Sequence, residues 1–395
     1  MKNRQIILTT VLLTLGSFAL PPRTQAVVPA PDGGYPNFNT AEGQNALFSL
    51  TTGQWNTALG AFTLRSDTDG SFNTAVGTAA LFSNVGSENT AVGAAALLLN
   101  TGSSNTGVGA DALLSNTIGA ANTADGSSAL QNNTTGNDNT ATGRQALFNN
   151  TTGGSNTAVG VFALNNNIDG GANTAIGVNV LQNNTHGHNN TAIGLNALGG
   201  SATGNFNIGL GSNAGMNVTS ASNVICIGAD GNNVDNACYI GQIFGATSSG
   251  GTAVFVNSNG RLGTTTSSKR FKQDIKPMDN VSEALYLLKP VSFRYKKEFD
   301  PAGASQLGLV AEDVEKIAPD LVVHDKEGRP YSVRYEQVNA MLLNEFLKEH
   351  AKVEKLEAAL DTVKKCLNEQ GARIQKVSAK IEVSEPAAKT AFNSH

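Results

Sequence analysis

Two side-chain types that can do nucleophilic chemistry meet in the stretch TTSSKRFKQDI, residues 265–275. A pair of serines is followed at once by basic residues, in a chain that has no lysine between Lys2 and Lys269. A serine hydroxyl is a weak nucleophile that needs a base, and a lysine amine can be that base when burial or neighbouring cations keep it neutral. Attack on the peptide bond just before the serine would be intramolecular, so positioning would lower much of the barrier. The stretch is a candidate self-cleavage site; the alternative is a plain linker, because serine and lysine are common residues.

The elements on the two sides of this stretch differ in composition. The chain before it is rich in Asn, Gly and Thr, whereas the chain after it is charged and helical in pattern. The length allows two or three domains. A net charge of −4 and a pI near 5.8 give no basic surface for nucleic acid. The glycines of GLGSNAG, residues 209–215, lack a following helix and lysine, so we expect no phosphate site and no cofactor.

The first 26 residues have the layout of a secretory signal peptide. Two early basic residues precede an apolar run from Ile6 to Leu20, and Thr24 and Ala26 form a small-residue cleavage site. We expect export, with a mature chain that starts near Val27 and a secreted or cell-surface location. The alternative is an uncleaved membrane anchor. Since no second long apolar stretch follows, we expect no membrane span once the signal is removed.

A pentapeptide of the form NTAxG returns every 16 or 17 residues. An Ala-Leu pair follows most copies, as at Ala80 and Ala163. Such a period predicts a solenoid in which each unit buries its apolar face against its neighbours. Because Gly, Asn and Thr favour turns and short strands, the unit should be β. The copies begin at Asn39, Asn56, Asn73, Asn89, Asn105, Asn122, Asn139, Asn156, Asn173 and Asn190, with the weaker NIGLG at Asn207 and NVICIG at Asn223.

Each repeated residue type has an expected place in the turn of the solenoid. The recurring Asn should form a ladder of side-chain amides that satisfies backbone groups of the turns. The inward groups should be Ala, Val, Ile and Leu with scarce aromatics such as Trp55, Phe72 and Phe206. A coil this thin buries little apolar area, so it should need side-by-side partners. Glycines should take the corners where φ is positive, namely Gly77, Gly93, Gly160, Gly177 and Gly194.

The repeats resemble the left-handed β-roll head of trimeric autotransporter adhesins, whose repeats follow an Asn-Ser-Val-Ala-Ile-Gly theme. NTAVG and NTAIG are similar to shortened forms of it, and NVICIG is closer still. The resemblance covers residues 37–245 and implies a left-handed β-roll or solenoid, assembled as a homotrimer with its strands wound about a common axis.

The chain after the repeats changes character twice. Residues 246–266 should form a neck, in which TAVFV and NSNGRLG make a β-hairpin with Asn-Gly at the turn. A small α+β domain should occupy 267–350, with an amphipathic helix before Pro290, a strand around Phe293, a strand and a helix before Pro319, and further strands. From Val338 a long helix should begin.

Heptads in that helix predict a coiled coil over 351–384. Position a would hold Val353, Leu360, Leu367, Ile374 and Ile381, and position d would hold Leu356, Val363, Gln370 and Val377. Eight of these nine residues are apolar, which favours a coiled coil over a lone surface helix and is compatible with a trimer. The tail, 385–395, should be disordered.

The chain from Ser267 resembles the intramolecular chaperone and auto-processing peptidase domain of phage tailspikes and tail fibres. The signature residues are Ser267, Arg270, Lys272 and Ile275, and LKPVSFRYK, LGLVAEDVEKIAPDLV and VRYEQVNAMLLNEFLKEH follow in order. The resemblance implies that Ser267 is the nucleophile, that Lys272 is its general base, and that the broken bond joins Thr266 to Ser267. Ser268 stands where the family usually has Asp.

Other candidate sites have weaker support. His186 and His188 of THGH could hold a metal only if copies came together, so we expect no metal site. The aspartates of the repeats are scattered, unlike a glycosidase pair. Cys226 and Cys238 could pair or stay as free thiols, and Cys366 could pair only between chains.

Two functions follow. The first is an exported, fibrous, adhesin-like surface protein whose C-terminal chaperone drives trimerisation and then cuts itself off by Ser-Lys autoproteolysis. Its partners would be its own copies, and surface glycans or other cells. The second is a phage-derived tail fibre or tailspike-like protein that binds or degrades polysaccharide. Clustered acidic side chains on one face of the array would favour the second, and a bland Asn and Thr surface favours the first.

Overall fold

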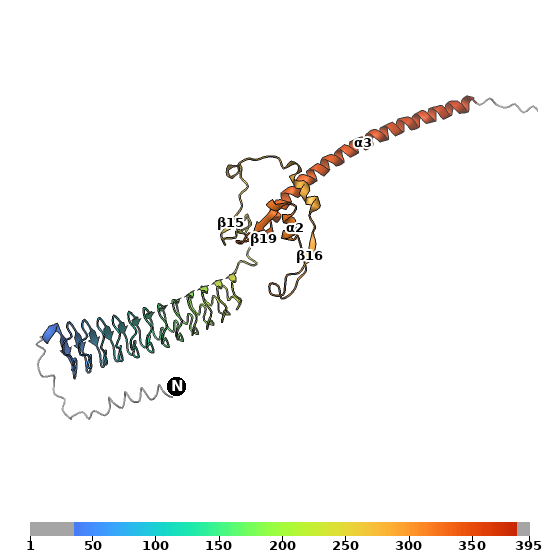
Figure 1. Cartoon of the computed structure of the whole chain (residues 1–395). Coiled ribbons are helices and arrows are strands. Elements are labelled where there is room, and N and C mark those ends of the chain that lie inside the picture. Colours follow the sequence, from blue (N-terminus) through green and yellow to red (C-terminus); the bar gives the residue numbers. More distant parts are fainter. Residues whose placement is uncertain (1–34, 385–395) are drawn as a thin grey trace, which may run out of the picture. The chain divides into compact units, whose positions relative to one another are not determined.

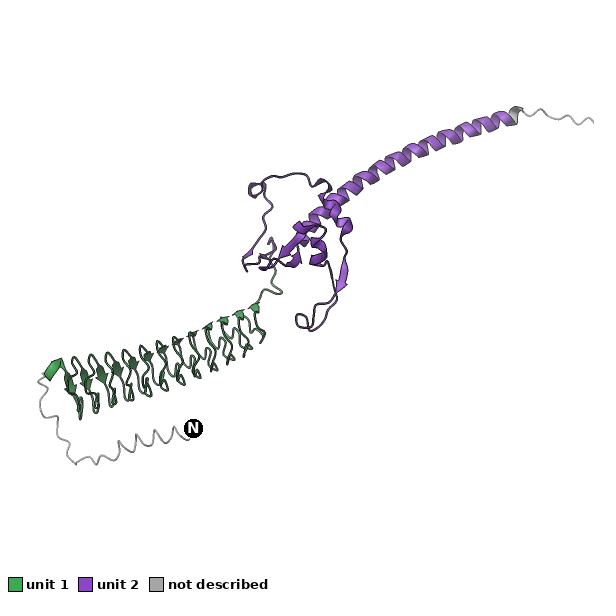
Figure 2. Cartoon of the chain, viewed as in Figure 1, with its two compact units in different colours: residues 1–247 green, residues 248–395 purple. Residues whose placement is uncertain are grey.

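The computed structural model describes residues 35–384, so the expected signal peptide, 1–26, and the expected tail, 385–395, lie outside the described residues. The chain forms two compact units that divide after Thr247 (Figures 1 and 2). Each unit has its own core of buried apolar residues and is stabilised by its own contacts. None of the described helices is both long enough and apolar enough to cross a membrane.

Unit 1 is a β-solenoid whose thirteen described strands form one parallel sheet in chain order, after the 3₁₀ turn η1 (Pro36–Phe38) (Figure 1). Equivalent repeat residues pair, as in Thr157↔Thr174 and Ala158↔Ala175. The expected β array is therefore confirmed. The strands are β1 (Thr40–Glu42), β2 (Thr57–Leu59), β3 (Thr74–Val76), β4 (Thr90–Val92), β5 (Thr106–Val108), β6 (Thr123–Asp125), β7 (Thr140–Thr142), β8 (Thr157–Val159), β9 (Thr174–Ile176), β10 (Thr191–Ile193), β11 (Ile208–Leu210), β12 (Ile225–Ile227) and β13 (Cys238–Ile240).

The core of unit 1 consists mainly of rows of Ala and Leu. The middle residue of most strands, such as Ala158, points inward and is fully buried, because successive side chains of a strand face opposite sides. The second repeated pair, such as Ala163 and Leu164, is buried opposite it. A small residue on the strand and a larger Leu across from it can fill the interior of a thin coil.

The repeated Asn forms the expected ladder. Asn139 Oδ1 accepts the backbone N–H of Asn156 at 3.0 Å, and Asn156 Nδ2 donates to the Gly170 carbonyl at 2.9 Å. The same pattern runs from Asn39 up to Asn207, which receives the N–H of Val224 at 2.8 Å. These amides are buried, and they satisfy backbone groups that would otherwise be orphaned.

A second buried Asn row runs parallel to the first and was not predicted. Each member donates its Nδ2 to the side chain one turn earlier, as Asn167 does to Asn150 at 2.7 Å. The row starts at Asp67, which accepts from Asn84 and has no amide of its own to donate to the preceding turn. Burial raises the pKa of the Asp67 carboxyl, against the opposing effect of its hydrogen bonds. The row comprises Asn84, Asn100, Asn116, Asn133, Asn150, Asn167 and Asn184.

Two expectations about unit 1 were wrong. The aromatic residues Trp55, Phe72 and Phe206 lie outside the core and are exposed, because the thin interior is filled by Ala and Leu with a few Val and one Cys. The NVICIG copy is shifted by one residue, since Ile208 pairs with Ile225 and Val224 therefore takes the place of the ladder Asn. The last turn is also shorter, because Ile225 pairs with Cys238.

The turns need left-handed backbone at more than the expected glycines. Gly77, Gly93, Gly160, Gly177 and Gly194 have φ between +120° and +137°, which confirms their corner role. Non-glycine rows also have positive φ, among them the buried Leu81 (φ 53°) and Leu164 (φ 50°). Cys226 and Cys238 are free thiols: Cys226 is buried inside the coil, while Cys238 is exposed.

Unit 2 contains the neck hairpin, β14 (Phe255–Val256) with β15 (Leu262–Gly263), as expected from its Asn-Gly turn. Further antiparallel pairs join β16 (Val291–Phe293) with β17 (Gln306–Gly308) and β18 (Val322–His324) with β19 (Pro330–Val333). The helical elements are η2 (Lys269–Phe271), η3 (Asp279–Leu287), α2 (Ala311–Glu315), η4 (Pro319–Leu321) and α3 (Tyr335–Ser384). The predicted amphipathic helix before Pro290 is thus the 3₁₀ segment η3.

Candidate functional site

The two residues predicted to carry the chemistry lie together. Lys272 Nζ donates a hydrogen bond to Ser267 Oγ at 3.3 Å. The turn η2 brings them close, because it reverses the chain over the residues between them and its end is fixed by the Lys272 N–H, which donates to the Lys269 carbonyl. A nucleophile and a base at this separation can exchange a proton after a small approach.

The pair is open to water in the single chain. Residues 265–275 are all exposed, and the Arg270 guanidinium lies over the Phe271 ring, 4.7 Å from its centroid. The guanidinium and the ring are therefore stacked on each other in η2, next to Ser267 and Lys272. Burial, which keeps a lysine amine neutral, would have to come from groups outside the described chain.

A polar clamp fixes η3 to α3, and its members lie too far apart in the chain for a sequence pattern to reveal it. The Glu345 carboxylate accepts from Ser282 Oγ at 2.5 Å, Tyr286 Oη at 2.9 Å and Lys348 Nζ at 2.8 Å. Asn344 Nδ2 donates to Ser282 Oγ at 2.7 Å. Lys348, and then Ser282, lower the pKa of Glu345 to about 2.

The polar clamp predicts that the folded chain loses stability in acid. The pKa of Glu345 is about 2 in the folded chain against an ordinary value of 4.5, so its contribution to stability is present above about pH 4.5 and is lost as the pH falls towards 2. Glu345→Gln should therefore unfold α3 at a lower temperature than the wild type near neutral pH, with the gap closing in acid. Circular dichroism melts of the full chain measure this.

Glu349→Gln is the matched control, because Glu349 is exposed and its contact with Lys352 Nζ is long, at 3.6 Å. It should melt like the wild type at every pH. A constant gap between Glu345→Gln and the wild type down to about pH 3 would contradict the role of the ionised carboxylate.

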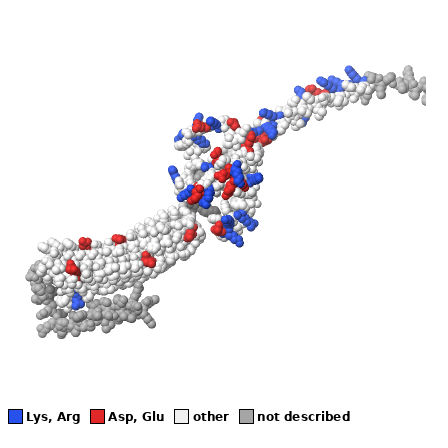
Figure 3. Space-filling model, viewed as in Figure 1, with Lys and Arg blue, Asp and Glu red and all other residues white. Residues whose placement is uncertain are grey.

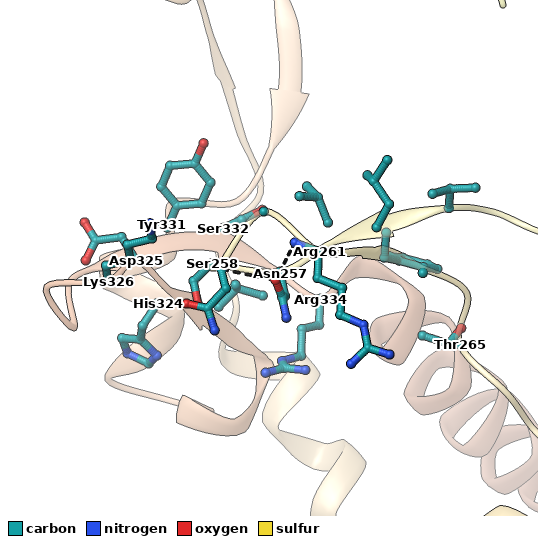
Figure 4. Close-up of a pocket in the computed structure, with 18 of the residues that line it drawn as sticks. Asn257, Ser258, Arg261, Thr265, His324, Asp325, Lys326, Tyr331, Ser332 and Arg334 are labelled. Carbon is teal, nitrogen blue, oxygen red and sulfur yellow. Dashed lines mark hydrogen bonds between the residues drawn. The ribbon is translucent and has the colours of Figure 1, made fainter. Parts of the chain in front are cut away.

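The neck hairpin and the β18–β19 hairpin line a cavity of about 1600 Å³ (Figure 4). Arg261 on the neck hairpin and Arg334 beside β19 extend towards the same side of it, and Thr265 lies at its edge. Because Thr264 and Thr265 line this cavity, the chain just before Ser267 runs along its wall. The sequence predicted the neck hairpin and further strands after Pro319, but it could not show that the two hairpins face one another.

The core of unit 2 is small and supports these hairpins. Val314 of α2, Leu321 of η4, Val333 of β19 and Met341 of α3 are buried against one another. Outside this core, the apolar heptad residues of α3, such as Leu360 and Ile374, are exposed in the single chain. An open apolar stripe of this length is typical of a helix that packs against another helix.

Comparison with known families identifies the segment that starts at the serine. Residues 267–323 match the Peptidase S74 family model, the chaperone of endosialidase. That family is an auto-processing intramolecular chaperone domain, which is consistent with self-cleavage. The Peptidase S74 segment begins at Ser267, includes Lys272 and ends within β18. No curated protein and no solved structure matches the chain.

The histidines of the repeats lie against the preceding turn. His186 Nδ1 is 2.6 Å from Asp169 Oδ1, and His188 Nδ1 accepts the Gly171 N–H at 2.9 Å. Across residues 35–384, no three or more His, Cys, Asp or Glu side chains gather in a way that could hold a metal ion. Both histidines therefore have a structural place in the turn.

Proposed function

We propose that this chain is a fibrous protein whose C-terminal module gathers three copies, aids the winding of their β-solenoids and then severs itself between Thr266 and Ser267. The observation that carries the proposal is the 3.3 Å contact between Ser267 Oγ and Lys272 Nζ at the start of the Peptidase S74 segment. A Peptidase S74 segment behind a β-solenoid fits a tail fibre or tailspike-like protein.

The chemistry would proceed in two steps. Lys272 takes the proton of Ser267 Oγ, which attacks the Thr266 carbonyl carbon; the C–O bond forms, the C–N bond breaks, and the proton passes to the departing Ser267 amine. The result is an ester between Thr266 and the Ser267 hydroxyl. Water then hydrolyses the ester, which leaves a Thr266 carboxylate and a fragment that begins with Ser267.

Assembly would set the time of this cut. A lysine must be neutral to act as a base, burial favours the neutral form, and the single chain leaves the pair in water. Packing of neighbouring copies around the pair would supply that burial. The β-solenoids need a common register, which is slow to find, and chain ends held together by α3 raise the effective concentration of the repeats.

Export and surface exposure of the assembled fibre are part of the proposal, with glycans or other cells as the partners of the array. What supports a binding rather than a degrading role is the face of unit 1 seen in Figure 3, on which carboxylates are sparse and scattered. The signal-like residues 1–26 support export.

The dependence of cleavage on assembly can be tested in α3. Leu360→Lys together with Leu367→Lys places charge at two a positions, which are exposed in the single chain and would be buried in a coiled coil. The variant should be monomeric by light scattering and should release the 267–395 fragment at least about tenfold more slowly, since gathering of chains is lost.

Ala351→Lys together with Ala358→Lys puts the same two charges on the outer face of the same helix and should behave like the wild type in both assays. Full-speed cleavage by a monomeric Leu360→Lys, Leu367→Lys chain would rule out the coupling while leaving the cleavage chemistry intact.

A further inference from the structure

The outward side chains of the last six strands of unit 1 are uncharged and largely apolar. In β8–β13 the middle residue points inward, and the residues beside it face out, reading TAV, TAI, TAI, IGL, ICI and CYI. Ile176 and Leu210 keep 39% and 44% of their surface exposed. We call these outward residues of β8–β13 the apolar strand face. Its main row is Val159, Ile176, Ile193, Leu210, Ile227 and Ile240.

The first half of the sheet differs. There the same row is interrupted by Glu42 in β1, Asp125 in β6 and Thr142 in β7. Towards the other end the second outward row gains apolar character as well, because Ile208 and Ile225 replace the usual Thr. The apolar strand face is thus the longer of two uninterrupted apolar stretches of this row, since Leu59, Val76, Val92 and Val108 of β2–β5 form a shorter one.

The rows are straight and closely spaced, since each residue stacks on its equivalent in the next strand, as Ile176 does on Ile193. A soluble protein seldom leaves an apolar surface of this extent in water. None of the outward residues of β8–β13 is charged, and the face of unit 1 seen in Figure 3 carries few charges that would keep a partner away.

We propose that the apolar strand face is the contact surface between copies of this chain, packed parallel and in register. Another copy has the same strand spacing, so its rows can meet every strand at once. An antiparallel copy aligned over all thirteen strands would put Asp125 of β6 against Val159 of β8, and Glu42 of β1 against Ile240 of β13. Parallel packing avoids this, because it sets the polar strands β6 and β7 opposite one another, where water can enter.

This inference rests on the proposed assembly and adds the face through which it occurs. The open heptad stripe of α3 points to the same partner, because one chain then carries two unpartnered apolar stripes that parallel copies would cover together. Contact would begin next to the gathered chain ends and spread towards β1.

Cysteine cross-linking tests the face. In a full chain with Cys238→Ser and Cys366→Ser, Ile193→Cys places a thiol on the apolar strand face, while Ile168→Cys places one on a turn. The two isoleucines are 38% and 40% exposed, so they are matched. A short bismaleimide should link Ile193→Cys chains to each other at least about tenfold more than Ile168→Cys chains, since contact raises the effective thiol concentration.

The two ways of failing are distinguishable. Light scattering could show an oligomer while cross-linking is equal at both positions or occurs only at residue 168. This result would mean that assembly occurs through another face, and it would overturn the inference alone. A monomer that links at neither position would overturn both the inference and the proposed assembly. A lysine pair gives a second readout: Ile193→Lys should lower the melting temperature of unit 1, and Ile168→Lys should not.

Discussion

Ser267→Ala should leave the chain in one piece. The methyl group cannot attack the Thr266 carbonyl, and removal of an essential nucleophile lowers such rates by about 10³-fold or more. The purified variant should run as a single band of 40.8 kDa less any signal peptide, whereas the wild type should give the array and the 267–395 fragment. Mass spectrometry of the wild-type fragment should find Ser267 at its N-terminus.

Lys272→Ala should fail in the same way, because the hydroxyl then loses the amine that lies 3.3 Å from it. The matched controls are the neighbours of each residue. Ser268→Ala removes a hydroxyl that makes no capping hydrogen bond, and Lys276→Ala removes an exposed cation four residues after Lys272. Both should still be cut. Wild-type fragments from Ser267→Ala would show that another group performs the cleavage or that a contaminating protease does.

The array was predictable from sequence because its repeat is local. One period carries the strand, the corner glycine and the ladder Asn, so Asn139 and Gly160 could be placed by counting. The second Asn row escaped notice because its members, such as Asn133, lie within variable NN and SN segments. The outward place of Trp55 and Ile176 could not be predicted, because a period shows which residues are equivalent without showing which side of the coil they face.

Of the candidate site, only the arrangement of residues that are close in the sequence could be predicted. Ser267 and Lys272 are five residues apart, so a turn between them was enough to place them together, and the match over residues 267–323 covers the first part of the domain expected at 267–350. Contacts between distant segments were beyond sequence reasoning. Ser282 and Glu345 are 63 residues apart, and no motif around either residue indicates that they form a hydrogen bond.

The glycine in the turn before a ladder Asn is held in place by hydrogen bonds from both rows of Asn side chains. The Gly86 carbonyl accepts Nδ2 of Asn73 at 3.0 Å and Nδ2 of Asn84 at 2.7 Å. The two amides approach the carbonyl from different turns, so the backbone at Gly86 cannot move without breaking one of them. The next turn then lies directly against its Cα.

Gly86→Ala should therefore be among the most damaging single substitutions in unit 1. A Cβ at this position would lie 1.9 Å from the Gly102 carbonyl oxygen, which is itself held by Asn89 and Asn100. Because backbone must shift and hydrogen bonds must lengthen, we expect a loss of about 3 kcal/mol in the free energy of unfolding, measured by urea titration of the full chain with circular dichroism.

Gly154→Ala is the matched control, since its Cβ would lie 3.1 Å from the Asn137 carbonyl oxygen in a half-exposed turn and needs an adjustment of only a few tenths of an ångström. Both substitutions reduce the freedom of the unfolded chain equally, so the difference between them isolates the contact with the next turn. Equal stability of the two variants would mean that the turns can slide past each other. The stacked carbonyls would then not set the spacing of the solenoid.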